Sequence, residues 1–326
     1  MMAFDQTRAK QRRCYGAVVL IGAISLSSPC ATAAPPITSA AFAPDGKQLV
    51  TGSTAGIAVW SWPDLQPLKK LATQLDHVHD LAFSPRGDLL AAVGGFPAEA
   101  GRLELWTWPE GKLQHSASPH DDVTYSVAWS SDGQKLATAG GDRKVLVHSL
   151  PPEGGTTNKL IGHSHGVLAV RYLPGDMSLV SAGRDQSLRL WEVGSGKALR
   201  TFDNHTGAVV GLAVRPGQTE GTAPWVASIG ADRTLRFWQP TIGRLVRFAK
   251  LESEPLAIEW TADGARAVVS SVDGKLRVID PDTVELLTTL PALDGWAYTL
   301  LRAPQTNTFL VAGNGGQMKA VAIGEE

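Results

Sequence analysis

Residues 162–192 read GHSHGVLAVRYLPGDMSLVSAGRDQSLRLWE, and the distinctive side chains of this stretch return along the chain. They are His163, Ser181, Asp185 and Trp191. The same set follows 42 to 47 residues later, as His205, Ser228, Asp232 and Trp238. One repeat earlier the set is His120, Thr138 and Asp142, with His148 in place of the tryptophan. A catalytic triad occurs once in a site, so this repetition indicates a structural unit rather than a protease.

A turn signal also repeats, at an interval of about 42 residues, which is typical of propeller blades. Its seven forms are Pro44-Asp45-Gly46, Pro85-Arg86-Gly87, Ser131-Asp132-Gly133, Pro174-Gly175-Asp176, Pro216-Gly217, Ala262-Asp263-Gly264 and Pro304-Gln305-Thr306. Apolar residues alternate at period two in the short segments around each turn, as expected for strands. The chain has 34 glycines and 20 prolines, which favour many turns and few long helices.

Each repeat contains up to four such segments; in the fourth repeat they are residues 170–172, 179–181, 188–191 and 198–202. We therefore predict an all-β fold, a single seven-bladed β-propeller over residues 34–326 with four-stranded antiparallel blades. A β-sandwich also contains many strands, but its sequence does not repeat at a fixed period. The chain stops just after the third strand of the last repeat, so the last blade is predicted to have three strands.

The repeats resemble the WD-repeat (Trp-Asp repeat) β-propeller family, in particular its exported bacterial members. The resemblance rests on Gly162-His163 at the start of a repeat, Phe83-Ser84-Pro85 after a first strand and Leu190-Trp191-Glu192 in a third strand. The chain departs from the family because the Trp-Asp pair itself is nowhere present. The resemblance implies a non-enzymatic protein-interaction scaffold, with no cofactor, no metal and no catalytic residue.

The resemblance also implies a role for the repeated set. Asp185 is expected to accept a hydrogen bond from His163, while Ser181 contacts the other ring nitrogen and accepts from the Trp191 indole. Such a network ties the strands of one blade together. It is complete in repeats four and five and partial in repeat three, and Thr51 and Asp273 are remnants in repeats one and six. Repeats one, two and seven are expected to lack the full network and to be where the ring varies and binds.

In this family the loops entering the first strand and those joining the second to the third strand share one face, which usually binds the partner. The candidate partner residues on that face are His79, Phe96, Glu99, Asp121, Tyr125, His165, Arg184 and Trp296. The insertion from Gly95 to Gly101 is predicted to form a flap above the face, with a neutral loop insertion as the alternative. A second candidate is the edge between Gln317 and Ile323, where a partner protein could add a strand.

Two other functions are possible for a propeller. The first is a propeller enzyme, lactonase-like or dehydrogenase-like, and the second is a glycan or small-ligand binder that uses the central channel. Both require polar side chains that converge on the axis, whereas the inner strands carry Ala40, Ala41, Ala82, Ala128, Ala169 and Ala213. The sequence therefore predicts a channel wall of small apolar side chains, without a converging set of polar groups. His77 and His79 share a strand face and could chelate a metal, but no further ligand is assignable.

Residues 1–33 are predicted to be a secretory signal peptide, because four basic residues precede an uncharged apolar stretch and Ala31-Thr32-Ala33 provides a cleavage motif. The apolar stretch is shorter than the roughly 20 residues that span a bilayer, so stable membrane insertion after cleavage is not expected. The mature protein would be exported, either periplasmic or secreted. It would lose Cys14 and Cys30 and keep 26 basic against 30 acidic residues, a balance that argues against nucleic acid.

Overall fold

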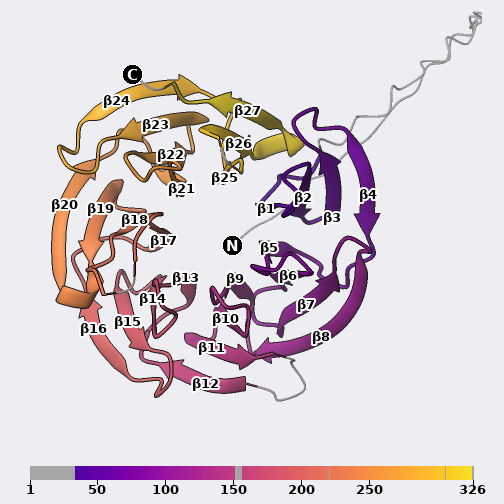
Figure 1. The fold of residues 1–326 in the computed structure, drawn as a ribbon, viewed down its shortest axis with the longest axis horizontal. Coiled ribbons are helices and arrows are strands. Elements are labelled where there is room, and N and C mark those ends of the chain that lie inside the picture. Colours follow the sequence, from indigo (N-terminus) through magenta and orange to yellow (C-terminus); the bar gives the residue numbers. More distant parts are fainter. Residues whose placement is uncertain (1–33, 151–155, 220, 305, 325–326) are drawn as a thin grey trace, which may run out of the picture. The chain divides into compact units, whose positions relative to one another are not determined.

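The computed structural model describes residues 34–150, 156–219, 221–304 and 306–324. Seven antiparallel sheets are arranged in a ring around a central axis (Figure 1), so the predicted seven-bladed propeller is confirmed. Six sheets have four strands and the last has three, as predicted. The predicted signal peptide, residues 1–33, lies outside the described residues. Within the described part of the chain, no helix has the length and apolar character needed to cross a membrane.

The first four blades follow one another along the chain. Blade 1 contains β1 (Ser39–Phe42), β2 (Gln48–Ser53), β3 (Gly56–Ser61) and β4 (Pro67–Leu71). Blade 2 contains β5 (Val78–Phe83), β6 (Leu89–Gly94), β7 (Gly101–Thr107) and β8 (Lys112–His120). Blade 3 contains β9 (Thr124–Trp129), β10 (Lys135–Gly140), β11 (Lys144–Ser149) and β12 (Thr156–Ile161). Blade 4 contains β13 (Val167–Tyr172), β14 (Ser178–Gly183), β15 (Leu188–Glu192) and β16 (Ala198–Phe202).

The remaining blades complete the ring. Blade 5 contains β17 (Val209–Val214), β18 (Val226–Gly230), β19 (Thr234–Gln239) and β20 (Arg244–Lys250). Blade 6 contains β21 (Pro255–Trp260), β22 (Ala267–Ser271), β23 (Lys275–Ile279) and β24 (Leu286–Pro291). Blade 7 contains β25 (Thr299–Arg302), β26 (Thr308–Ala312) and β27 (Met318–Ala322). The described residues also include two short 3-10 helices, η2 (Pro240–Ile242) and η3 (Asn314–Gly316).

The core lies between neighbouring blades, whose sheets pack face to face. Trp191 of blade 4 packs in one cluster with Ala137 and Val147 of blade 3. Trp238 of blade 5 packs likewise against Val180 and Leu190 of blade 4. Both tryptophans are at most 1% exposed, and burying a side chain of this size contributes about 4 kcal/mol or more. The periodic apolar residues therefore specify the ring as well as the single blade.

The start of the described chain meets the last blade. The Ile37 backbone N–H donates to the Gly313 carbonyl over 3.0 Å, which joins blade 1 to the loop that follows β26. Blade 7 has no fourth strand among the described residues, and the side chains of β27 are half-buried or exposed. The third strands of blades 3 and 5, β11 and β19, are mostly buried beneath an outer strand. Within the described residues, β27 is thus the edge strand of the last blade.

Candidate functional site

The repeated His, Ser, Asp and Trp side chains of blade 4 meet inside the sheet. His163 Nδ1 lies 2.9 Å from Asp185 Oδ2, and His163 Nε2 lies 2.7 Å from Ser181 Oγ. The Trp191 indole N–H donates to the same Ser181 Oγ over 2.8 Å. Ser181 therefore accepts from Trp191 and donates to His163, whose Nδ1–H donates to Asp185. Every polar atom of the set has a partner.

Blade 5 repeats this geometry, with His205 Nδ1 2.9 Å from Asp232 Oδ2 and His205 Nε2 2.8 Å from Ser228 Oγ. The Trp238 indole N–H donates to Ser228 Oγ over 2.8 Å. Both blades thus contain the complete four-residue network.

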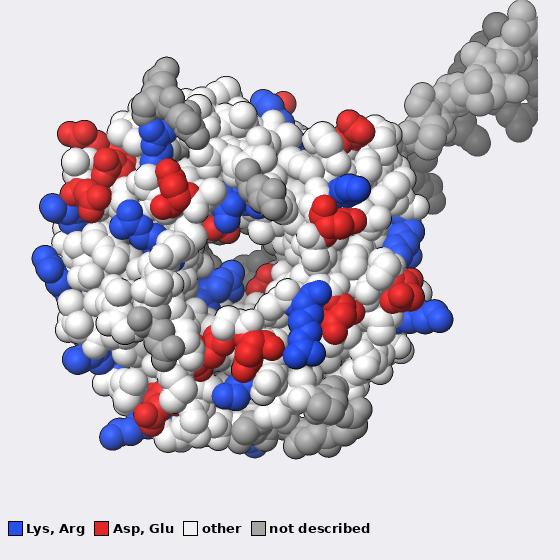
Figure 2. Space-filling view, viewed as in Figure 1, with Lys and Arg blue, Asp and Glu red and all other residues white. Residues whose placement is uncertain are grey.

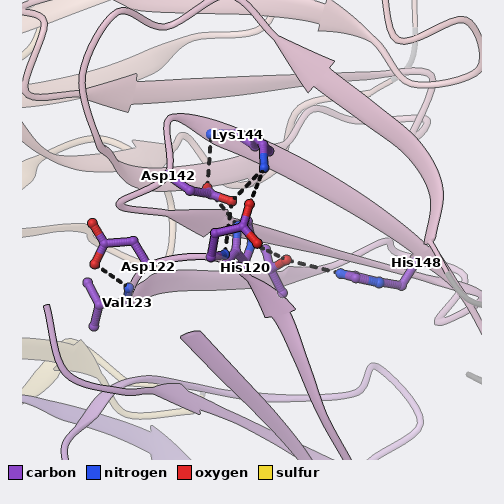
Figure 3. Close-up of polar contacts among 8 residues, drawn as sticks. His120, Asp122, Val123, Asp142, Lys144 and His148 are labelled. Carbon is purple, nitrogen blue, oxygen red and sulfur yellow. Dashed lines mark hydrogen bonds and ion pairs between the residues drawn. The ribbon is translucent and has the colours of Figure 1, made fainter. Parts of the chain in front are cut away.

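Blade 3 contains a variant of the network (Figure 3). His120 Nδ1 lies 2.9 Å from Asp142 Oδ1, and His120 Nε2 lies 2.9 Å from Thr138 Oγ1. His148 Nε2 lies 3.0 Å from the same Thr138 hydroxyl, which places a ring N–H where blades 4 and 5 have an indole. His148 therefore takes the place of the tryptophan, and the network in this blade also has four members.

The environment of these networks favours a structural role. Burial opposes ionisation of Asp142, yet the hydrogen bond and charge of His120 lower its pKa to about 2. The pKa values of Asp185 and Asp232 are also lowered, because hydrogen bonds outweigh the effect of burial. Ser181 and Ser228 are 0% exposed. A nucleophilic serine needs an accessible hydroxyl, so this geometry does not suit hydrolysis.

His148 makes the stability of blade 3 sensitive to pH. Burial, followed by the charges of His120 and His115, lowers its pKa from 6.5 to about 4. The unfolded chain therefore binds a proton more readily than the folded protein between these pH values, so stability is lost as the pH falls from 6.5 to about 4. We expect this residue to contribute about 3 kcal/mol of that loss.

Denaturant unfolding at pH 7 and pH 4 measures this contribution. The variant His148→Gln keeps a side-chain donor for Thr138 but cannot titrate, so its loss of stability on acidification should be smaller than that of the wild type. His165→Gln, at an exposed position, serves as the control and should behave like the wild type. An identical pH dependence for His148→Gln and the wild type would contradict the assignment.

Blade 2 lacks the full histidine network and contains a different one, which the sequence analysis did not predict. Glu104 on β7 is 0% exposed and occupies the centre of the blade. It accepts hydrogen bonds from the Trp106 indole over 3.2 Å, the Thr73 hydroxyl over 2.6 Å and the Gln74 backbone N–H over 2.8 Å. A single carboxylate from the third strand replaces the histidine and serine of the other blades.

The remnants in blades 1 and 6 differ from each other. The Trp60 indole donates to the Thr51 hydroxyl over 2.8 Å, which is one contact of the full network. Asp273 instead binds the buried Arg277, whose Nη2 lies 2.7 Å from Asp273 Oδ2. Blade 6 therefore contains an ion pair where blades 3, 4 and 5 have a histidine network.

The central channel contains charged side chains, contrary to the sequence-based expectation. It is a cavity of about 730 Å³ lined by the inner strands of all seven blades, and its wall includes Asp80, Arg171 and Glu259. Figure 2 shows acidic and basic side chains around the central opening. The alanines named above do lie on the inner strands, but these charged residues stand between them.

The candidate partner residues gather partly on the loop face. His79 lies 5.2 Å from Tyr125 in a T-shaped contact, and Arg184 lies over the Tyr125 ring and donates to its hydroxyl over 3.1 Å. Asp121 binds Lys144 over 2.7 Å. Glu99, Asp121, His165 and Arg184 are exposed, as are Phe96 (46%) and Trp296 (50%). The structure thus links His79, Tyr125 and Arg184 directly and leaves the other side chains separate.

Three further contacts lie on this face, and one of them involves Tyr298, which was not among the predicted residues. Tyr298 contacts Trp296 with their rings 5.6 Å apart, and His77 stacks on His79 at 4.3 Å. The Ala98 backbone N–H of the flap donates to Asp122 Oδ1 over 2.8 Å, which anchors the flap to blade 3. Across the described residues no group of three or more His, Cys, Asp and Glu side chains could hold a metal ion.

Comparison with known proteins finds one family model that matches parts of this chain. The model of the WD domain, G-beta repeat, matches residues 27–61, 111–149, 154–192 and 196–239. Four segments of this chain, just under half of its length, are thus similar to WD repeats. They cover the three inner strands of blades 1, 3, 4 and 5, which include all three blades with a histidine network.

Several WD-repeat relatives are eukaryotic proteins. Fizzy-related 3 of Arabidopsis thaliana is 28% identical over 120 residues, which are 37% of this chain and 24% of the relative. The anaphase-promoting complex subunit cdc20 of Dictyostelium discoideum is 29% identical over 133 residues, 40% of this chain and 26% of the relative. The nuclear distribution protein PAC1 of Arthroderma otae is 36% identical over 91 residues, 26% and 19% of the two chains. The alignments thus span about a quarter or less of each relative.

Proposed function

We propose that this WD-repeat propeller is an exported, non-enzymatic scaffold that presents its loop face to a protein partner. The observation that carries the proposal is the row of stacked side chains on that face, in which His77, His79, Tyr125 and Arg184 run from blade 2 across blade 3 to blade 4. Aromatic and arginine side chains held in place by their neighbours lose little entropy on binding, and they are common anchors of protein interfaces.

Two exposed aromatic rings extend this surface. Phe96 projects from the flap of blade 2, and Trp296 projects from the loop before β25 of blade 7. Exposed aromatic side chains are common anchors of protein interfaces. The occupation of each conspicuous His, Ser and Asp set by internal hydrogen bonds favours the scaffold over the enzyme. The name of one relative, a subunit of the anaphase-promoting complex, also suits a role in assemblies.

The open edge of blade 7 is the second part of the proposal. A partner strand paired with β27 would complete the four-stranded pattern of the other blades. On one side of β27, the Lys319 side chain reaches the Pro291 carbonyl of β24 over 3.4 Å. A basic residue at the edge also protects a free protein against self-association.

Export is supported by the pattern of charge and apolar residues before Ala34. The first matched WD segment begins at residue 27 and so overlaps residues 27–33 of the proposed signal peptide. N-terminal sequencing of the protein from the exported fraction tests this part: a start at Ala34 supports it, and a start at Met1 or Met2 contradicts it.

The partner surface is tested by affinity capture from the envelope and secreted fractions of the native host. We expect the wild type to enrich one protein. The double variant Tyr125→Ala/Trp296→Ala should capture about tenfold less of it or even smaller amounts, since central aromatic anchors contribute roughly 2 kcal/mol or more. The control Leu199→Ala/Ile242→Ala removes exposed apolar side chains from elsewhere on the ring and should capture as the wild type does. Equal enrichment by both double variants would move the partner away from this face.

A further inference from the structure

The central channel contains charged groups that the scaffold role does not use. Its wall carries Asp80 on β5, Arg171 on β13 and Glu259 on β21, and the aromatic rings of Tyr125 and Tyr298 also line it. Charged side chains that are partly withdrawn from water into a cavity destabilise the fold unless they are paired. The hydrogen bonds of these three residues therefore determine which of their polar atoms are free to bind a ligand.

One side of the channel is a continuous hydrogen-bonded chain across three blades. Arg171 Nη1 of blade 4 donates to Ser126 Oγ of blade 3 over 3.2 Å, and Ser126 Oγ donates to Asp80 Oδ2 of blade 2 over 3.0 Å. The backbone N–H groups of Val127 and Leu81 also donate to Asp80, over 3.0 and 2.9 Å. This chain fixes the Arg171 guanidinium. Its Nη2 and Nε atoms form no hydrogen bond with any described residue.

Glu259 belongs to another part of the wall, in blade 6. Within the described chain, the Glu259 carboxylate accepts one hydrogen bond, from the Trp260 backbone N–H to Oε1 over 2.8 Å. Burial raises the pKa of Glu259, while the positive charges of Arg302 and Arg171 act in the opposite direction. Arg171 thus lies close enough to act on Glu259 electrostatically, yet the two side chains form no ion pair. Gly211 of the intervening blade 5 lines the same cavity.

We propose that the channel binds a small zwitterion of the α-amino-acid type, whose carboxylate accepts from Arg171 and whose ammonium group donates to Glu259. An anion alone would leave Glu259 unpaired, and a cation alone would leave the free N–H groups of Arg171 unpaired. A ligand with both charges satisfies the two residues together. The cavity volume of about 730 Å³ lies in the range of small-molecule sites. This inference does not depend on the identity of the protein partner.

The test is isothermal titration calorimetry of the full chain with the standard L-amino acids at millimolar concentration. We expect saturable binding of at least one of them. Its N-acetyl derivative lacks the ammonium group and its methyl ester lacks the carboxylate, so each should bind about tenfold or more weakly. Absence of saturable binding for every amino acid would overturn the proposal. Equal affinity of either derivative would also overturn it, because the site would then select a single charge.

Two pairs of variants locate the site. Glu259→Gln and Arg171→Gln should each weaken binding about tenfold or more, since each removes one charge-assisted contact. The exposed residues Glu285 and Arg247 provide matched controls, and Glu285→Gln and Arg247→Gln should bind as the wild type does. Glu259→Gln preserves the shape of the side chain, so it keeps the test valid if Arg171→Gln fails to fold. Wild-type affinity in a folded Glu259→Gln protein would contradict the site.

Discussion

Replacing His163 by alanine should lower the free energy of unfolding by about 3 kcal/mol, because it leaves a cavity in the blade and removes buried hydrogen bonds. Asp185 loses the His163 donor and keeps those of Ser164 and Ser187, while the Ser181 hydroxyl loses its acceptor. Both groups stay inside the blade, because His163 is only 5% exposed and water has little access to the position. Guanidinium unfolding followed by tryptophan fluorescence measures the change, with ten tryptophans as reporters.

The control is two residues away. His165 is exposed on the loop face, so His165→Ala should change the stability by less than about 0.5 kcal/mol. The pair separates the structural network from the surface because both variants remove the same side chain from the same loop. If His163→Ala were as stable as His165→Ala, the network would not hold the blade together.

Much of this arrangement follows from the sequence because its information is local and repeated. The spacing of His163, Ser181, Asp185 and Trp191 recurs in His205, Ser228, Asp232 and Trp238, so one copy helps to interpret the other. The alternating apolar residues place Ser181 on a buried strand, β14, and the turn signals fix where that strand begins. The histidine networks and the three-stranded last blade could therefore be predicted.

Other features could not be predicted because they occur once and depend on the closed ring. Asp80, Ser126 and Arg171 lie about one repeat apart, and only the ring geometry brings them into one hydrogen-bonded chain. The sequence has alanines at neighbouring inner-strand positions, and it does not indicate that the charged residues Asp80, Arg171 and Glu259 face one cavity. The stacking of His79, Tyr125 and Arg184 likewise joins three blades.

Glu104 has a local signature in the sequence that differs from the histidine pattern. Two residues before the tryptophan of the third strand, blades 4 and 5 have Arg189 and Arg236, whereas blade 2 has Glu104. An acidic residue at a position that faces the interior must be paired. Its partners lie in the preceding loop, at Thr73 and Gln74, and Gln74 follows Leu71 by three residues as His163 follows Leu160, so it occupies the histidine position of the pattern.

Replacing Glu104 by alanine should therefore destabilise blade 2 by about 3 kcal/mol, because the donors of Trp106, Thr73 and Gln74 lose their common acceptor. Glu104 provides two of the hydrogen bonds that hold the loop from Leu71 to Val78, and Arg102 adds one to the Gln74 carbonyl, so without Glu104 the loop should open before the rest of the blade. Hydrogen exchange followed by mass spectrometry should show faster exchange in peptides that cover this loop. The unfolding midpoint measured on the same sample gives the global effect.

Glu110 provides the matched control, because it lies in the same blade, in the exposed turn after β7. Glu110→Ala should leave both the midpoint and the exchange of the 71–78 loop unchanged. Faster exchange confined to other blades in Glu104→Ala would mean that the carboxylate does not hold this loop. The loop leads into His77 and His79 at the start of β5, so its order bears directly on the partner face. Loss of partner capture in Glu104→Ala but not in Glu110→Ala would connect the buried carboxylate to binding through the position of these two histidines.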